Sequence, residues 1–96
     1  MNEAKLRRKL EQGDKHTEKS IRSRISRANK AEEVLAADLD HIVADDDRMY
    51  AALVRLEDSG LNVSGNLTNA VRWYYRAING RTFPQIKAYE RGVRPR

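Results

Sequence analysis

The 96-residue sequence contains no cysteine, two prolines, two histidines and one tryptophan. The absence of cysteine excludes disulfide bonds and thiolate metal ligands. No apolar run approaches the ~18 residues that a membrane-spanning helix needs, and the first residues do not form the apolar segment of a secretory signal. We therefore expect one small cytoplasmic domain that does not cross a membrane.

Residue patterns for catalysis or metal binding are also scarce. His16 and His41 lie far apart in the sequence, and neither belongs to a His-x-x-x-His or His-Glu-x-x-His motif. The aspartates of residues 45–47 lack the alternating ligands, central glycine and closing glutamate of an EF-hand loop. Gly60 and Gly65 are not followed by the Gly-Lys-Ser/Thr of a phosphate-binding loop. We expect no enzyme activity, no metal and no cofactor.

The charge is divided into three blocks. Residues 1–30 carry ten Lys or Arg against four Asp or Glu, a net +6; residues 31–60 carry two against nine, a net −7; residues 61–96 carry seven against one, a net +6. Basic ends can bind phosphates and release counterions, or they can pair with the acidic middle of the same or another chain. A solvated charged surface is the plain alternative.

The two ends of the sequence read as basic extensions of a helical domain over residues 21–91. Residues 1–20 predict a flexible basic arm without a core, since Gly13-Asp14 interrupts any helix and Leu6 and Leu10 are the only sizeable apolar residues after the first. Residues 92–96 predict a frayed basic tail.

Residues 21–26 admit two structures. As a strand, they would place Ile21 and Ile25 on one face and Arg22 and Arg24 on the other, and two paired copies could enter a major groove. As a helix, the isoleucines would begin the apolar stripe of the next element.

A helical period is clear from residue 31 onward. We expect two helices, about 30–43 and 46–59, because Asp45 and the next two aspartates suit a helix start; one long helix with a coiled-coil seam is the alternative. Gly60 is expected just beyond the second helix. The apolar stripe consists of Leu35, Leu39, Ile42, Met49, Leu53 and Leu56.

A further helix follows the turn at residues 61–66. It forms a helix–turn–helix hairpin with the helix over residues 46–59, so the expected fold class is mainly α. Asn62, Ser64 and Asn66 are candidate N-caps, and Asn79-Gly80 is the stop signal. A short last helix from about Pro84 to Arg91 would turn Ile86 and Tyr89 toward the body. The side chains expected in the core or at a dimer interface are Leu53, Leu56, Leu67, Val71, Trp73, Tyr74 and Ile78.

Aromatic residues at 73–75 have a second interpretation. Because they lie beside Arg72 and Arg76, they could stack on exposed bases, although core or interface packing is the commoner role of such residues.

Three stretches resemble a known family: Asp46-Asp47-Arg48-Met49-Tyr50-Ala51-Ala52-Leu53-Val54-Arg55-Leu56, Ser59-Gly60-Leu61-Asn62-Val63-Ser64, and Leu67 with Ala70-Val71-Arg72-Trp73-Tyr74. They resemble the two-helix core of ribbon–helix–helix DNA-binding proteins, over about residues 46–80. Gly65-Asn66-Leu67-Thr68-Asn69-Ala70 is similar to a stretch of plasmid mobilisation (relaxosome accessory) proteins. The resemblance implies an intertwined dimer whose paired strands read bases, with residues 62–64 at a turn that faces phosphate.

These observations predict a DNA-binding accessory or regulatory protein of plasmid or phage type. It would act as a homodimer, in a nucleoprotein complex that can include a protein partner. The alternative is a helical protein–protein interaction module that binds no nucleic acid. The residues expected to contact DNA are Arg22, Arg24, Arg27, Lys30, Asn62, Ser64, Arg72, Arg76 and Arg81.

Overall fold

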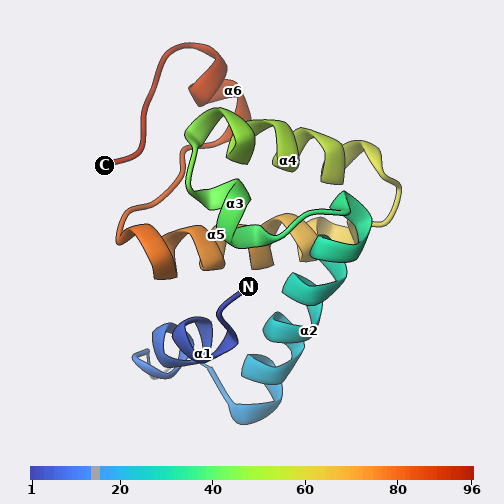
Figure 1. Ribbon diagram of the computed structural model, residues 1–96, viewed down its shortest axis with the longest axis vertical. Helices are drawn as coiled ribbons and strands as arrows, with labels where there is room; N and C mark the ends of the chain where they lie inside the picture. Colours follow the sequence, from blue (N-terminus) through green and yellow to red (C-terminus); the bar gives the residue numbers. More distant parts are fainter. Residues whose placement is uncertain (14–15) are drawn as a thin grey trace.

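The computed structural model describes residues 1–13 and 16–96, which fold into helices joined by short connections (Figure 1). The elements are α1 (Glu3–Glu11), α2 (Glu18–Leu35), α3 (Leu39–Val43), α4 (Asp46–Asp58), the 3₁₀ turn η1 (Val63–Gly65), α5 (Asn66–Asn79) and α6 (Ile86–Glu90). The described ranges contain no strand. The prediction of a small, mainly helical domain is therefore confirmed.

Helix α5 crosses the middle of the molecule and organises the rest. In Figure 1, α1 and α2 lie on one side of it, α4 and α6 on the other, and α3 lies between α4 and α5. Helices α1, α2 and α5 also contact one another in pairs. In this view α1 forms the lower part of the molecule and α4 the upper part. The Met1 amine nevertheless lies 3.2 Å from Glu32 and 3.0 Å from Asp38, so the basic and acidic blocks meet at the N-terminus.

Helix α1 corrects the prediction that residues 1–20 form no core. Leu6 and Leu10 are 0% exposed, and the side chain of Asn2 caps the helix by accepting the N–H of Lys5 at 3.1 Å. Two leucines four residues apart share one helix face, and packing against α2 and α5 supplies the stability that so short a helix lacks alone. Asp14 and Lys15, counted in the predicted arm, lie outside the described residues.

Helix α2 decides between the two structures considered for residues 21–26. The strand is wrong, because the helix begins at Glu18, where the Thr17 hydroxyl accepts the N–H of Ser20 at 3.1 Å. Ile21 and Ile25 are buried on the face that meets α5. A domain boundary at residue 21 would consequently divide a continuous helix.

The predicted helix over residues 30–43 is wrong, because the chain turns at Ala36. This residue has a φ of 52°, and the N–H groups of Ala36 and Ala37 donate to the carbonyl oxygens of Glu33 and Glu32, each at 3.2 Å. Such a pair of bonds closes a helix in the Schellman arrangement, which usually places glycine in the left-handed position. Asp38 then starts α3 by accepting the N–H of Asp40 at 2.8 Å.

The break at the three aspartates is confirmed. The Asp45 carboxylate accepts the N–H of Arg48 at 3.0 Å, and this hydrogen bond lowers the pKa of the carboxyl group from its ordinary value. Helix α4 ends at Asp58, and Gly60 has the expected left-handed φ of 75°. Helices α4 and α5 therefore form the predicted helix–turn–helix hairpin.

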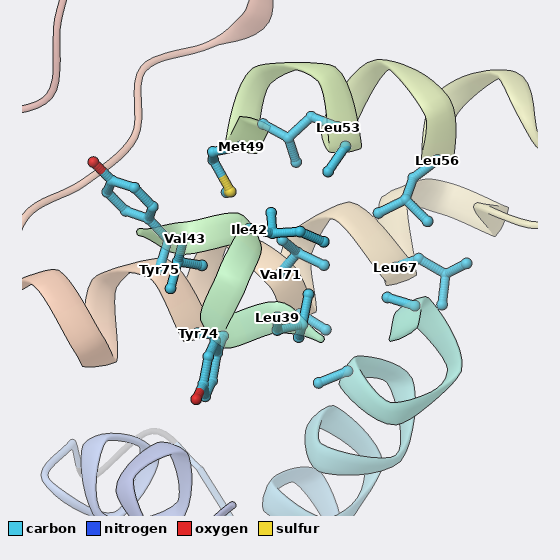
Figure 2. Close-up of a cluster of buried hydrophobic side chains, with 14 of the residues drawn as sticks. Leu39, Ile42, Val43, Met49, Leu53, Leu56, Leu67, Val71, Tyr74 and Tyr75 are labelled. Carbon is cyan, nitrogen blue, oxygen red and sulfur yellow. The ribbon is translucent and has the colours of Figure 1, made fainter. Parts of the chain in front are cut away.

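The core is one cluster with buried residues from all six α-helices of the described ranges, and Figure 2 shows its part around α3, α4 and α5. Tyr75 is also 0% exposed, although it is not among the core residues expected from the sequence. Trp73 and Ile78 lie partly buried at the edge. The core role, rather than a dimer contact, accounts for the burial within one chain of Leu53, Leu56, Leu67, Val71 and Tyr74.

Each of the four tyrosines donates its hydroxyl to a carboxylate, which explains much of the acidic block. The pairs are Tyr74 with Asp40, Tyr75 with Asp46 (2.7 Å), Tyr89 with Asp47 (2.6 Å) and Tyr50 with Glu90 (2.6 Å). Three of the four acceptors belong to residues 31–60, so aspartates of α3 and α4 hold tyrosines of α5 and α6. A buried hydroxyl needs such a partner.

The final segment is shorter than predicted, because α6 begins at Ile86 with Gln85 as N-cap. Tyr89 is buried and Ile86 partly buried, as expected. The tail at residues 92–96 is not wholly frayed: the Arg94 guanidinium lies 4.2 Å from the centre of the Tyr89 ring and donates to the Tyr89 carbonyl oxygen at 3.2 Å.

Candidate nucleic-acid interface

The cations of α1 and α2 divide into those with a carboxylate neighbour and those without. Arg7 lies 3.0 Å from Glu18, Arg22 lies 3.9 Å from the same carboxylate, and Lys30 lies 3.6 Å from Glu33. Among the residues that the structure describes, no ion pair engages Lys19 of α2. The same is true of six further residues: Lys5, Arg8, Lys9, Arg24, Arg27 and, in α5, Arg76. We call these six residues the cationic surface.

Trp73 lies at the meeting point of the cationic surface. The guanidinium carbons of Arg24 and Arg76 lie 5.5 and 5.6 Å from the centre of its ring, and the His16 ring meets it edge-on at 5.2 Å. Guanidinium groups at this distance are attracted by the negative face of an aromatic ring. The indole therefore gathers positive charge from two helices, α2 and α5.

In the described part of the chain, Arg24 lacks a hydrogen-bond partner for one buried atom of its guanidinium group. This atom is Nε, and the residue as a whole is partly buried. Burial, and then the neighbouring charge of Arg27, lower the pKa of Arg24. Partial desolvation of a guanidinium beside a like charge is unfavourable, so a bound anion would stabilise this arrangement.

Two hollows lie at the junction of α1 and α5, and a third lies between α5 and the chain that follows it. The middle one, of about 280 Å³, is lined by Lys9, Gln12, Gly13, His16, Trp73 and Arg76. A neighbour of about 220 Å³ is lined by Lys5, Arg8, Lys9, Gln12 and Ala77, and another of about 200 Å³ by Asn69, Arg72, Trp73, Arg76 and Thr82. The middle hollow shares Lys9 and Gln12 with the first neighbour, and Trp73 and Arg76 with the second.

The structure brings together only some of the residues that the sequence assigned to DNA. Arg24, Arg27 and Arg76 belong to the cationic surface. Arg22 and Lys30 are exposed on α2, but each lies next to a glutamate of its own helix. Their charge is thus already partly compensated.

Arg72 and Arg81 make internal contacts instead. Arg72 donates from Nη1 to the carbonyl oxygens of Phe83 (2.8 Å) and Pro84 (3.1 Å), and burial lowers its pKa. Arg81 donates from Nε to the Tyr75 hydroxyl at 3.0 Å, and its Nη2 atom lies 3.7 Å from Asp46. These contacts attach the chain after α5 to the body.

The turn before α5 is also closed on itself. The Asn62 side-chain oxygen accepts the N–H groups of Leu67 at 2.8 Å and Thr68 at 3.0 Å. Asn62 therefore occupies backbone donors that the family resemblance would direct to a phosphate. Ser64 is exposed, in a left-handed conformation with a φ of 52°.

Sequence reasoning missed Lys5, Arg8 and Lys9 as members of an ordered surface. The leucine pair of α1 was the available signal, since burying Leu6 and Leu10 turns residues between them toward solvent. The neighbourhood of His16 and Trp73 gave no sequence signal, because it depends on how α1, α2 and α5 pack.

Comparison of the chain with protein-family models, curated proteins and solved structures finds no match. Within residues 1–13 and 16–96, no group of three or more His, Cys, Asp or Glu side chains could hold a metal ion. None of the helices in these ranges has the length and apolar character to cross a membrane.

Proposed function

We propose that the protein binds DNA through the cationic surface. The observation that carries this proposal is the set of six cations of α1, α2 and α5 that have no carboxylate partner among the described residues. Arg24 and Arg76 of this set lie on the Trp73 ring, and Lys9 lines a hollow with it. Lysine and arginine side chains on such a surface neutralise phosphates and release their condensed counterions. Five aspartates of the acidic block, by contrast, have structural roles: Asp38 and Asp45 cap α3 and α4, and Asp40, Asp46 and Asp47 accept tyrosine hydroxyls.

The finer proposal is an accessory or regulatory protein of plasmid or phage type that acts as a dimer. It is supported by the resemblance of residues 46–80 to ribbon–helix–helix and mobilisation proteins. The base-reading ribbon of that family has no counterpart at residues 21–26, which are helical. DNA contact is therefore assigned to the helical surface, and the dimer contact to side chains outside the core.

The test is a titration with labelled duplex DNA at several salt concentrations. In the variant that replaces Arg8, Lys9, Arg27 and Arg76 by Gln, affinity should fall, and the plot of log K against log salt should flatten by about 0.9 for each phosphate that the protein no longer neutralises. Glutamine keeps much of each side chain's length and its helix propensity. A wild-type protein that binds DNA with the same salt dependence as the variant would contradict the proposal.

A matched control removes cations at the far end of the molecule. Lys87, Arg91 and Arg96 are exposed, and α6 lies at the opposite end from α1 in Figure 1. Replacing these three by Gln should leave most of the salt dependence intact. A solution mass measured alongside tests the dimer; salt-insensitive self-association with no DNA retention would favour the protein-interaction alternative.

A further inference from the structure

Trp73 borders two of the hollows on the cationic surface. It lines the one beside α1 with Gln12 and His16, and the one beside the chain after α5 with Asn69 and Thr82. Each hollow thus combines an aromatic wall, the Arg76 cation and side chains that can donate or accept hydrogen bonds. An aromatic wall is not needed to bind phosphate, because phosphates need only exposed hydrogen-bond donors and positive charge.

We propose that Trp73 is a stacking site for an unpaired base of a DNA strand whose phosphates lie on the cationic surface. This inference rests on the proposed function and specifies the form of DNA at that site. Base–aromatic stacking tolerates any base, because every base offers a flat π face. Gln12, Asn69 and Thr82 are placed to meet the edges of a base that enters either hollow.

The partial burial of Trp73 favours an unpaired base over a base pair. Its indole is packed against the core and rimmed by Arg24, Arg76 and His16. Bases inside a duplex are stacked on their neighbours, so their flat faces cannot reach a recessed ring. A single strand can turn a base out, and the two arginines can then contact its phosphates or stack on the base themselves.

The positive charges of Arg24 and Arg76 would be compensated by the phosphates of such a strand. Both lie on the same indole without a carboxylate in the described residues, and Arg24 has a buried Nε atom without a partner. A phosphate beside them would supply the missing acceptor and the opposite charge. Binding of the base and neutralisation of the arginines would then occur together.

The experiment uses the intrinsic fluorescence of Trp73, which is the single tryptophan of the chain. Three probes of equal length are titrated into the full-length protein: a single DNA strand, its duplex, and an abasic single strand that keeps the phosphates without bases. We expect strong quenching by the single strand, with little quenching by the duplex or the abasic strand. Equal quenching by all three at matched saturation would overturn the stacking inference.

Two variants test the same site by anisotropy of the labelled single strand. Trp73→Ala should weaken single-strand binding by about 5- to 150-fold, the range for removal of one base–aromatic stack, and should weaken abasic-strand binding by a much smaller factor. Trp73→Phe should keep most of the single-strand affinity. The Phe variant and the wild-type fluorescence remain decisive if the Ala variant does not fold, which circular dichroism would show.

The outcomes separate this inference from the proposed function. If single, duplex and abasic strands bind with equal salt-dependent affinity and Trp73→Ala changes none of them, stacking is wrong and phosphate binding stands. If no strand binds at any salt concentration, both proposals fail.

Discussion

The Arg72 guanidinium donates a hydrogen bond of 2.8 Å to the backbone carbonyl oxygen of Phe83. This bond joins the middle of α5 to the connection that leads to α6. Phe83 is 2% exposed, and its ring lies 5.2 Å from that of Tyr75 and 5.0 Å from that of Tyr89. Arg72 therefore holds the backbone of the connection at Phe83, the residue whose ring packs in the core.

Replacing Arg72 by Met should destabilise the fold by about 2 kcal/mol, because two carbonyl oxygens lose a charged donor. Arg76→Met is the matched control: it lies one turn further along α5, is exposed, and should change stability by no more than about 0.5 kcal/mol. Urea unfolding measures both. The DNA salt slope should respond in the opposite way, falling for Arg76→Met and not for Arg72→Met. Equal stability of the two variants would argue against the structural role of Arg72.

Ala36 should accept glycine with a gain in stability. Its φ of 52° is unfavourable for a residue with a Cβ atom by about 1–2 kcal/mol, whereas the added freedom of glycine in the unfolded chain costs about 0.5–1 kcal/mol. The difference predicts that Ala36→Gly stabilises the protein by roughly 0.5–1 kcal/mol, seen as a higher urea midpoint. Ala51→Gly, at an exposed position inside α4, is the control and should destabilise. A loss of stability in both variants would contradict the left-handed turn at residue 36.

Ala36 and Asp45 show which helix ends the sequence reveals. Asp45 is followed by two more aspartates and accepts a hydrogen bond from a residue three positions on, so its capping role is local and was predicted. Ala36 has no such signal, because alanine is the best helix former. Its turn depends on Glu32, whose carboxylate accepts the N–H of Leu39 at 2.9 Å, and on the packing of α3 in the core.

The candidate site was predictable in its charge and not in its geometry. The basic character of residues 1–30 identified Arg24 and Arg27. A local signal separates Arg22 from them, because Glu18 lies four residues earlier on the same helix and also binds Arg7 of the preceding helix. Trp73 was expected among core or interface residues because aromatic side chains bury a large area. Its contacts with Arg24 and His16 arise only when α2 and the chain before it pack on α5.

Tyr89 should make stability depend on alkaline pH. Its hydrogen bond to Asp47, followed by burial, raises the pKa of the hydroxyl from the ordinary value of 10 to about 12. Because the folded state holds this proton more tightly than the unfolded state, the stabilisation is fully present below pH 10 and is lost as the pH rises through 12. The free energy of unfolding, measured from neutral pH through pH 12, should fall in this window.

Tyr89→Phe provides the control for the alkaline effect. The variant should be less stable at neutral pH, and its loss of stability between pH 10 and pH 12 should be less steep. Some dependence should persist, since burial also raises the pKa values of Tyr74 and Tyr75. A wild-type stability that stays level through pH 12 would exclude the Tyr89–Asp47 hydrogen bond.

Leu10 tests whether α1 belongs to the folded body. The side chain is 0% exposed, so Leu10→Ala should cost about 2–5 kcal/mol through reduced burial and the cavity that remains. Leu61→Ala is the matched control, because Leu61 is 51% exposed in the turn of the hairpin and should change stability by no more than about 0.5 kcal/mol. If the two variants unfold at the same urea concentration, α1 is not docked as described. A large cost at Leu10 alone means that a folded helix holds Lys5, Arg8 and Lys9 in the hollows beside α5, and that DNA need not order them first.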